Sequence, residues 1–150
     1  MTVELFFSRA RSVAEVIEHS ILGCVASLDA AIYRFNNPRL ARAIEAAGDR
    51  GVRVRLLVDQ NKFEESQATR ELLAKHHLPF RVLYGVKGKG SKMHHKFCVL
   101  DGRAVMTGSY NWTLESEHQN YESLLVLDSP EIVTAYEGEF DELWAAAHEV

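Results

Sequence analysis

Cysteine is scarce in this chain. Among 150 residues there are only two, Cys24 and Cys98, which are far apart and lie among apolar residues. Neither belongs to a Cys-x-x-Cys pair, so the sequence gives no support to a zinc site. Two buried thiols in a reducing compartment are the expected state.

Long apolar runs are also missing. No segment approaches the roughly 18 consecutive apolar residues that a membrane span needs. The N-terminus lacks the basic region and apolar core of a signal peptide. We therefore expect a soluble, cytoplasmic protein with no stable membrane association. Its hydrophobic fraction of 47% and length of 150 residues suit one globular domain with a substantial core.

Basic residues are absent from the last part of the chain. Residues 115–150 carry ten acidic groups and no Lys or Arg. Residues 1–114 therefore hold all 17 basic groups against 11 acidic ones, a net charge of +6, although the whole chain has −4. A basic surface of this kind would attract a polyanion. A solvated acidic helix at the C-terminal end explains the acidic part equally well.

Apolar periodicity alternates between strand-like and helix-like segments along the chain. The expected strands cover 3–7, 24–35, 52–59, 80–84, 92–100, 103–107 and 121–127. The expected helices begin after Ser8, at Pro38, near Ser66 and at Pro130, and the first of them should bury Leu22. This alternation predicts an α/β fold, in which helices flank a mixed, largely parallel central sheet, and a single domain over 1–150.

Polar residues with a spacing of two mark the second half of the chain. His94 and Lys96, expected on one strand, should project to the same side, and Ser109 and Asn111 repeat this spacing on a neighbouring stretch. An imidazole, an ammonium, a hydroxyl and an amide on one surface suit an anionic tetrahedral group such as a phosphodiester. Asp101 is followed by glycine, which predicts the tight turn of a β-hairpin away from this surface.

A glycine-rich basic loop over 85–92 directly precedes these residues. We expect substrate contacts from its lysines, Lys87, Lys89 and Lys92, although loops of this composition are commonly flexible connections. The loop lacks the Gly-x-x-x-x-Gly-Lys-Ser/Thr pattern, so binding of a nucleoside triphosphate is not supported. Arg34, at the end of the second expected strand, should lie at the mouth of the site and contact a phosphate.

The long spacing of these residues resembles the HKD signature of the phospholipase D superfamily. The signature is carried by His94, Lys96, Asp101, Gly108, Ser109 and Asn111. The order of elements, the Arg-Gly-Val-x-Val stretch at 50–54 and the Asn120-x-Glu122 segment are similar to the small bacterial endonucleases of this superfamily. The resemblance covers nearly the whole chain.

The resemblance implies a role for each residue. His94 would attack phosphorus and form a phosphohistidine, while Lys96 and Asn111, with Ser109, would hold the non-bridging oxygens. Glu122 would orient the imidazole and stabilise its cation. Asp101 and Gly108 would be structural members of the motif. The resemblance implies no metal ion and no cofactor.

The same mechanism requires two histidines, one as nucleophile and one as acid for the leaving group. This chain has a single motif and no room for a second. Pairing two identical subunits around a two-fold axis would bring two His94/Lys96 sets together. A homodimer with one composite active site is therefore predicted.

Three functions are compatible with these residues. The first is a metal-independent endonuclease acting on DNA or RNA, single-stranded or double-stranded. The second is a phospholipase D or cardiolipin-type lipid phosphodiesterase, because the core chemistry is the same. The third is a non-catalytic module that kept the fold. The intact residue set argues against the third, and the basic loop favours the nuclease over the lipid enzyme.

Overall fold

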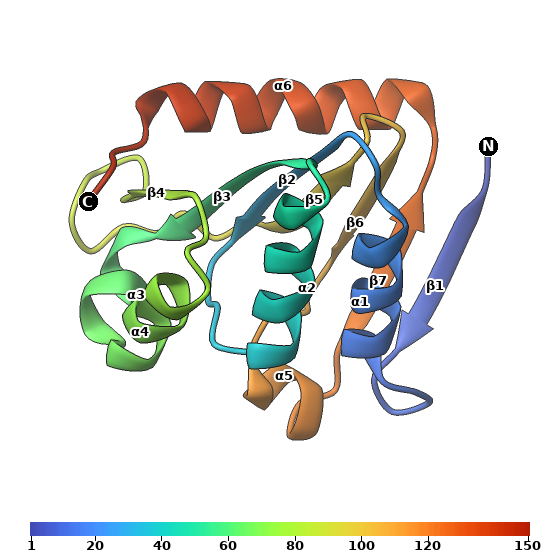
Figure 1. The fold of residues 1–150 in the computed structure, drawn as a ribbon, viewed down its shortest axis with the longest axis horizontal. Coiled ribbons are helices and arrows are strands. Elements are labelled where there is room, and N and C mark those ends of the chain that lie inside the picture. Colours follow the sequence, from blue (N-terminus) through green and yellow to red (C-terminus); the bar gives the residue numbers. More distant parts are fainter.

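Seven strands form one sheet in the computed structural model, which describes residues 1–150 (Figure 1). The strands are β1 (Val3–Phe7), β2 (Ser27–Ile32), β3 (Arg53–Asp59), β4 (Phe80–Leu83), β5 (Lys96–Leu100), β6 (Ala104–Gly108) and β7 (Ser123–Leu127). The helices are α1 (Val13–Gly23), α2 (Pro38–Asp49), α3 (Gln60–Glu65), α4 (Gln67–Lys75), α5 (Leu114–His118) and α6 (Pro130–Ala146). The order in the sheet is β1-β7-β6-β5-β2-β3-β4.

The α/β class and the mixed sheet with flanking helices are confirmed, but the sheet is not largely parallel. Only the β2–β3 and β3–β4 pairs are parallel, and the other four pairs are antiparallel. A parallel pair needs a crossover helix, which α2 and the α3–α4 pair supply. No helix follows β4, so β5 returns beside β2 in the opposite direction and a hairpin leads on to β6.

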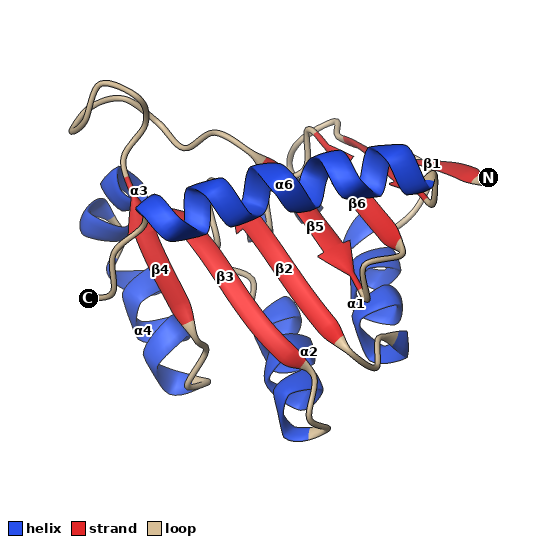
Figure 2. Cartoon of the chain, turned by 90° about the horizontal axis from the view of Figure 1, so that it is seen from above, coloured by secondary structure: helices blue, strands red, loops and turns tan.

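Helices cover both faces of the sheet (Figure 2). On one face, α1, α2 and α4 pack over a core of 29 buried residues, which includes Ile17, Ile44 and Leu72. On the other face, α6 crosses the strands and buries a smaller core of nine residues with Val133 and Phe140. None of the helices combines the length with the apolar character of a membrane span. Both cysteines are buried free thiols.

Most of the predicted helix starts are confirmed. Asn37 caps α2 with Pro38 in the first turn, Ser66 caps α4, and α6 begins at Pro130. The predicted start of the first helix, after Ser8, was wrong, because the side chain of Ser12 caps α1. Ser8 instead accepts a hydrogen bond from Glu122 N at 2.8 Å.

The first helix and several strand ends also differ from the prediction. Leu22 is 53% exposed because it lies on the outer side of α1. β2 is shorter than the predicted 24–35, and β5 begins at Lys96, so residues 92–95 approach it as irregular chain. The short helices α3 and α5 carry too little apolar periodicity to be recognised.

Asp101 lies in the hairpin between β5 and β6, with a positive φ of 56°. Its carboxylate accepts hydrogen bonds from the backbone N–H groups of Val25, Ala26 and Ser27 at 2.7 to 3.1 Å. Burial acts to raise the pKa of Asp101, but these backbone hydrogen bonds outweigh it and the pKa is lowered. Asp101 thus joins the hairpin to the start of β2, away from His94.

We expect Asp101→Ala to lower the free energy of unfolding by about 2 to 4 kcal/mol, since three N–H groups lose a charged acceptor. Denaturant unfolding at pH 7 measures this, with the exposed Asp49→Ala as a control that should stay within about 0.5 kcal/mol. A folded carboxylate with a lowered pKa stabilises the protein above its unfolded pKa. The difference between Asp101→Ala and the parent should therefore shrink as the pH falls through the folded pKa of Asp101, and an equal difference at all pH values would contradict this account.

Candidate active site

The predicted site residues gather at one edge of the sheet. The carboxyl ends of β2, β3 and β6 and the amino ends of β5 and β7 meet there, because β5 and β7 run opposite to their neighbours. Lys96 opens β5 opposite Ile32 at the end of β2, and Gly108 ends β6 opposite Leu124. Residues far apart in the sequence are thus brought to one end of the molecule.

His94 and Lys96 are in direct contact. The Lys96 ammonium lies 3.2 Å from His94 Nδ1 and 3.3 Å from Nε2, and it donates to the His94 carbonyl oxygen at 2.8 Å. The ring of Tyr33, from the end of β2, packs on the imidazole with centroids 4.6 Å apart. His94 precedes the strand rather than lying in it as predicted, yet the two side chains lie on the same side.

The electrostatics of this pair favour a neutral imidazole. Burial lowers the pKa of His94, and the ammonium groups of Lys96 and Lys92 lower it further. Burial also lowers the pKa of Lys96, although the Glu122 carboxylate acts in the opposite direction. A neutral imidazole beside a cation is suited to attack an anionic phosphoryl group.

Glu122 and Ser109 form a second part of the same edge. Ser109 Oγ donates to Glu122 Oε1 at 2.6 Å and accepts from Ser123 N at 3.0 Å. Glu122 Oε2 accepts from Ser116 Oγ at 2.8 Å and from Asn120 Nδ2 at 3.2 Å. The expected contact of Glu122 with the imidazole is not made within the chain, because hydrogen bonds to these other side chains hold the carboxylate.

The side chain of Asn111 is hydrogen-bonded to the backbone of Arg34, the residue after Tyr33. Asn111 Oδ1 accepts a hydrogen bond from Arg34 N at 3.2 Å. The Arg34 guanidinium forms an ion pair with Glu115 at 3.3 Å, so its charge is partly neutralised by α5. Arg34 therefore lies beside Asn111, and its guanidinium already has a carboxylate partner.

The basic loop is folded on itself and fastened to α3. Lys87, Lys89 and Lys92 are all exposed. Asn61 Nδ2 donates to Ser91 O at 2.7 Å, and Asn61 Oδ1 accepts from Gly90 N at 3.0 Å. A loop tethered in this way presents its lysines from a defined backbone, and Lys92 lies close to His94.

Gly108 is fixed by the close approach of two strands. A Cβ at this position would overlap the carbonyl oxygen of Ser123 on β7. This contact explains a glycine directly before Ser109, and it assigns Gly108 a packing role.

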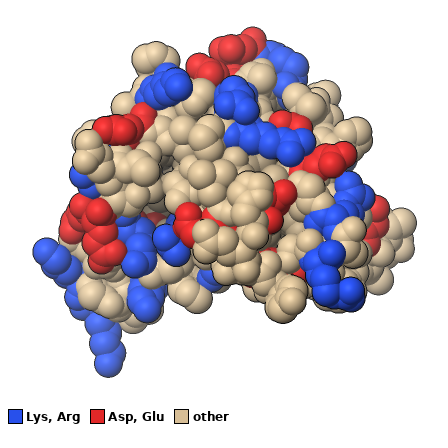
Figure 3. All heavy atoms as spheres, turned by 90° about the horizontal axis from the view of Figure 1, so that it is seen from below, with Lys and Arg blue, Asp and Glu red and all other residues tan.

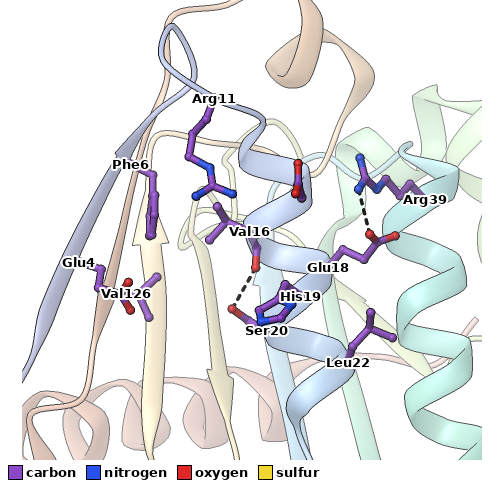
Figure 4. A pocket seen from close by; sticks show the side chains of 11 residues that line it. Glu4, Phe6, Arg11, Val16, Glu18, His19, Ser20, Leu22, Arg39 and Val126 are labelled. Atoms are coloured by element: carbon purple, nitrogen blue, oxygen red, sulfur yellow. Dashed lines mark hydrogen bonds and ion pairs between the residues drawn. The ribbon is translucent and has the colours of Figure 1, made fainter.

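Predicted site residues line two of three hollows on the surface. One of about 600 Å³ is lined by Phe7, Arg9, Tyr121 and the Ser109–Glu122 pair. A second of about 440 Å³ lies between the basic loop and α6 and reaches His94. A third of about 540 Å³ lies between β1 and α1, where Arg39 pairs with Glu18 at 2.9 Å (Figure 4), and none of the predicted site residues lines it.

The charged groups around the site are of both signs. On the face opposite α6, Lys and Arg side chains alternate with Asp and Glu (Figure 3). The acidic helix α6 also reaches the site region, since His95 Nε2 lies 2.8 Å from Glu139 Oε2. A local basic region around the loop therefore replaces the basic face that the charge asymmetry suggested.

No group of three or more His, Cys, Asp or Glu side chains is arranged to hold a metal ion.

Sequence reasoning missed Asp59, Asn61 and Ser116. Asp59 ends an apolar strand and Asn61 follows it, which is a position where polar side chains commonly face a site. Ser116 lies on α5, which gave no signal of its own.

Comparison with known proteins identifies the family of the chain. The family model described as "Cardiolipin synthase, PLD-like domain" matches residues 17–144. A mitochondrial cardiolipin hydrolase of Xenopus tropicalis is 38% identical over 118 residues, covering 79% of this chain and 54% of that protein. The human protein of the same name is 34% identical over 125 residues, covering 83% of this chain and 48% of that protein. The chain thus spans about half the length of these curated relatives.

Two solved structures match almost end to end. Nuc from Salmonella typhimurium, a phospholipase D family member, superposes with a TM-score of 0.89 at 23% identity, covering 99% of this chain and 97% of Nuc. NucT from Helicobacter pylori gives 0.88 at 25% identity and covers 99% of both chains. The chain belongs to the phospholipase D-like family.

Proposed function

We propose that this protein is a phosphodiester hydrolase that cleaves DNA or RNA internally through a phosphohistidine intermediate. The observation that carries the proposal is the contact of the His94 imidazole with the Lys96 ammonium at 3.2 Å, at an edge that also holds Ser109 and Glu122. This combination offers a nucleophile, a fixed positive charge and hydrogen-bonding groups for a phosphoryl centre.

The reaction proceeds in two displacements. A neutral His94 attacks phosphorus, a P–N bond forms, and the P–O bond to the leaving group breaks while an acid protonates that oxygen. Water then attacks the phosphohistidine, giving its proton to the same group acting as a base, and the P–N bond breaks. Lys96, with Asn111 and Ser109, offsets the charge on the non-bridging oxygens in both steps.

A second copy of the chain supplies the acid. One His94 cannot be nucleophile and leaving-group acid in the same step, and each chain has one. An exposed apolar strip supports pairing: Val3, Leu5 and Phe7 are 54%, 52% and 48% exposed on the α6 side of β1. Phe7 also lines the hollow beside Ser109 and Glu122. Burying this strip against its two-fold copy would place the hollow beside Ser109 and Glu122 of each copy next to the interface.

The basic loop supports a nucleic-acid substrate. Lys87, Lys89 and Lys92 are exposed on a fastened loop that directly precedes His94 in the chain, and a polyanion extends past the cleaved phosphate to reach them. A lipid phosphodiester is the second candidate, because the relatives at 38% and 34% identity are named cardiolipin hydrolases. A cytoplasmic location without stable membrane association stays a prediction.

The test is incubation with single-stranded DNA, duplex DNA, RNA and cardiolipin vesicles in excess EDTA. We expect internal cleavage of a nucleic acid at an undiminished rate, because the proposed chemistry uses side chains alone. The matched control is Lys96→Ala, which should lose about 10²- to 10³-fold in rate as a charge-stabilising group is removed. Lipid hydrolysis without nucleic-acid cleavage would establish the second candidate instead, and a strict need for added Mg²⁺ would contradict the mechanism.

A further inference from the structure

Asp59 is a fully buried carboxylate that the proposed mechanism does not use. It is the last residue of β3 and is 0% exposed. It takes part in none of the ion pairs of the chain. A buried charge without a cation is costly unless hydrogen bonds satisfy it, so its partners define what it does.

Both oxygens of Asp59 accept from backbone N–H groups. Oδ2 accepts from Lys62 N at 3.0 Å and caps α3, whereas Oδ1 accepts from Met93 N at 2.9 Å. Met93 is buried and directly precedes His94. One side chain thus joins the helix that fastens the basic loop to the segment that carries the imidazole.

This hydrogen bond matters because residues 92–95 belong to no strand. The sheet does not set the position of His94, so single contacts must do so. On one side, Tyr33 N donates to His95 O at 2.9 Å. On the other side the Met93–Asp59 hydrogen bond fixes the backbone, which leaves His94 between two tethers.

Asp59 also acts on the charge state of the imidazole. The groups around His94 are Lys96 on β5, Lys92 and His95 on its own segment, and Asp59 on β3, with the Tyr33 ring packed against it. Burial and the cations lower the pKa of His94, and the Asp59 carboxylate opposes them. Removing this negative charge therefore lowers the pKa of His94 further.

We propose that Asp59 is a positioning residue, which holds the Met93–His94 backbone so that the imidazole faces the substrate phosphorus. The inference rests on the proposed role of His94 as the nucleophile. Asp59 acts through the backbone and touches no substrate. An imidazole displaced by about 1 Å loses up to about 10²-fold in rate.

The experiment compares Asp59→Asn and Asp59→Ala with the parent protein on bis(p-nitrophenyl) phosphate. We expect kcat to fall about 10- to 100-fold with little change in KM, because the small substrate does not reach the loop. The acid limb of the pH profile should move to lower pH, since neutral His94 forms at lower pH without the Asp59 charge. Asp59→Asn keeps the size and one acceptor oxygen, so it should retain more activity than Asp59→Ala.

Asp29→Asn is the matched control. Asp29 is also buried, at 4% exposure, but it binds Arg53 and Arg55 on β3 at the end of β2 away from His94. Its loss should lower the melting temperature and leave kcat and the pH profile unchanged. Rates are expressed per folded protein from thermal unfolding, so a general loss of stability does not imitate the effect.

Failure of the proposed function and failure of the positioning role of Asp59 give different results. If His94→Ala keeps the parent rate, the proposed function is wrong. If His94→Ala is inactive while folded Asp59→Asn keeps the parent kcat and pH profile, only the positioning role is overturned. An NMR titration of the His94 ring in the parent and in Asp59→Asn gives a readout independent of turnover, with an unmoved pKa counting against the inference.

Discussion

Replacing His94 by alanine should abolish phosphodiester hydrolysis, with kcat falling about 10⁴-fold or more, because the variant has neither nucleophile nor leaving-group acid. His94 is an exposed residue outside the strands, with its ring against Tyr33 and Lys96, so the fold should be unaffected. Initial rates on bis(p-nitrophenyl) phosphate, together with thermal unfolding, measure both quantities. The loss exceeds that expected for Lys96→Ala, since an ammonium stabilises charge but forms no bond to phosphorus.

His95→Ala is the control for this prediction. The two histidines are adjacent, but His95 is turned to Glu139 of α6 at 2.8 Å. The hydrolysis rate of His95→Ala should stay within about threefold of the parent rate, because this side chain takes no part in the reaction. If the two variants lose the same activity, or if folded His94→Ala keeps more than about 1% of the parent rate, His94 is not the nucleophile.

Replacing Leu5 by glutamate should separate the proposed dimer and remove most of the activity. Leu5 is the middle residue of the exposed strip on β1 and is 52% exposed in the single chain. A carboxylate buried in an apolar interface costs several kcal/mol, which shifts dissociation by about 10²-fold or more. Sedimentation should show a shift from dimer to monomer, with hydrolysis falling in parallel because each monomer retains only one His94.

Glu4→Gln provides the matched control, since neighbouring residues of a strand project to opposite faces. Glu4 lines the hollow between β1 and α1 (Figure 4), so its substitution should change neither mass nor rate. A monomeric Leu5→Glu protein with the parent kcat would contradict the composite site. A Leu5→Glu protein that is still a dimer would place the interface elsewhere.

The sequence by itself predicted the local features. Asn37-Pro38 starts a helix because the proline ring fixes a helical φ and the asparagine side chain caps a free N–H group. Asp101 followed by glycine makes a turn because both residues tolerate positive φ, here 56° and 59°. The spacing of His94 and Lys96 predicted that both side chains project to the same side, because side chains two residues apart on an extended chain face the same way.

Only the tertiary structure decided what depends on partners far along the chain. The direction of β5 follows from its pairing with β2, and no local pattern encodes that choice. Glu122 was expected at the imidazole, yet its carboxylate binds Ser109 and Ser116. Asp59 ends an apolar strand, but no local pattern encodes its hydrogen bond to Met93 N, 34 residues away. The residue types and their spacing thus predicted phosphate chemistry at His94 and Lys96. The orientation of these groups depends on long-range backbone contacts, which exist only once the sheet has formed.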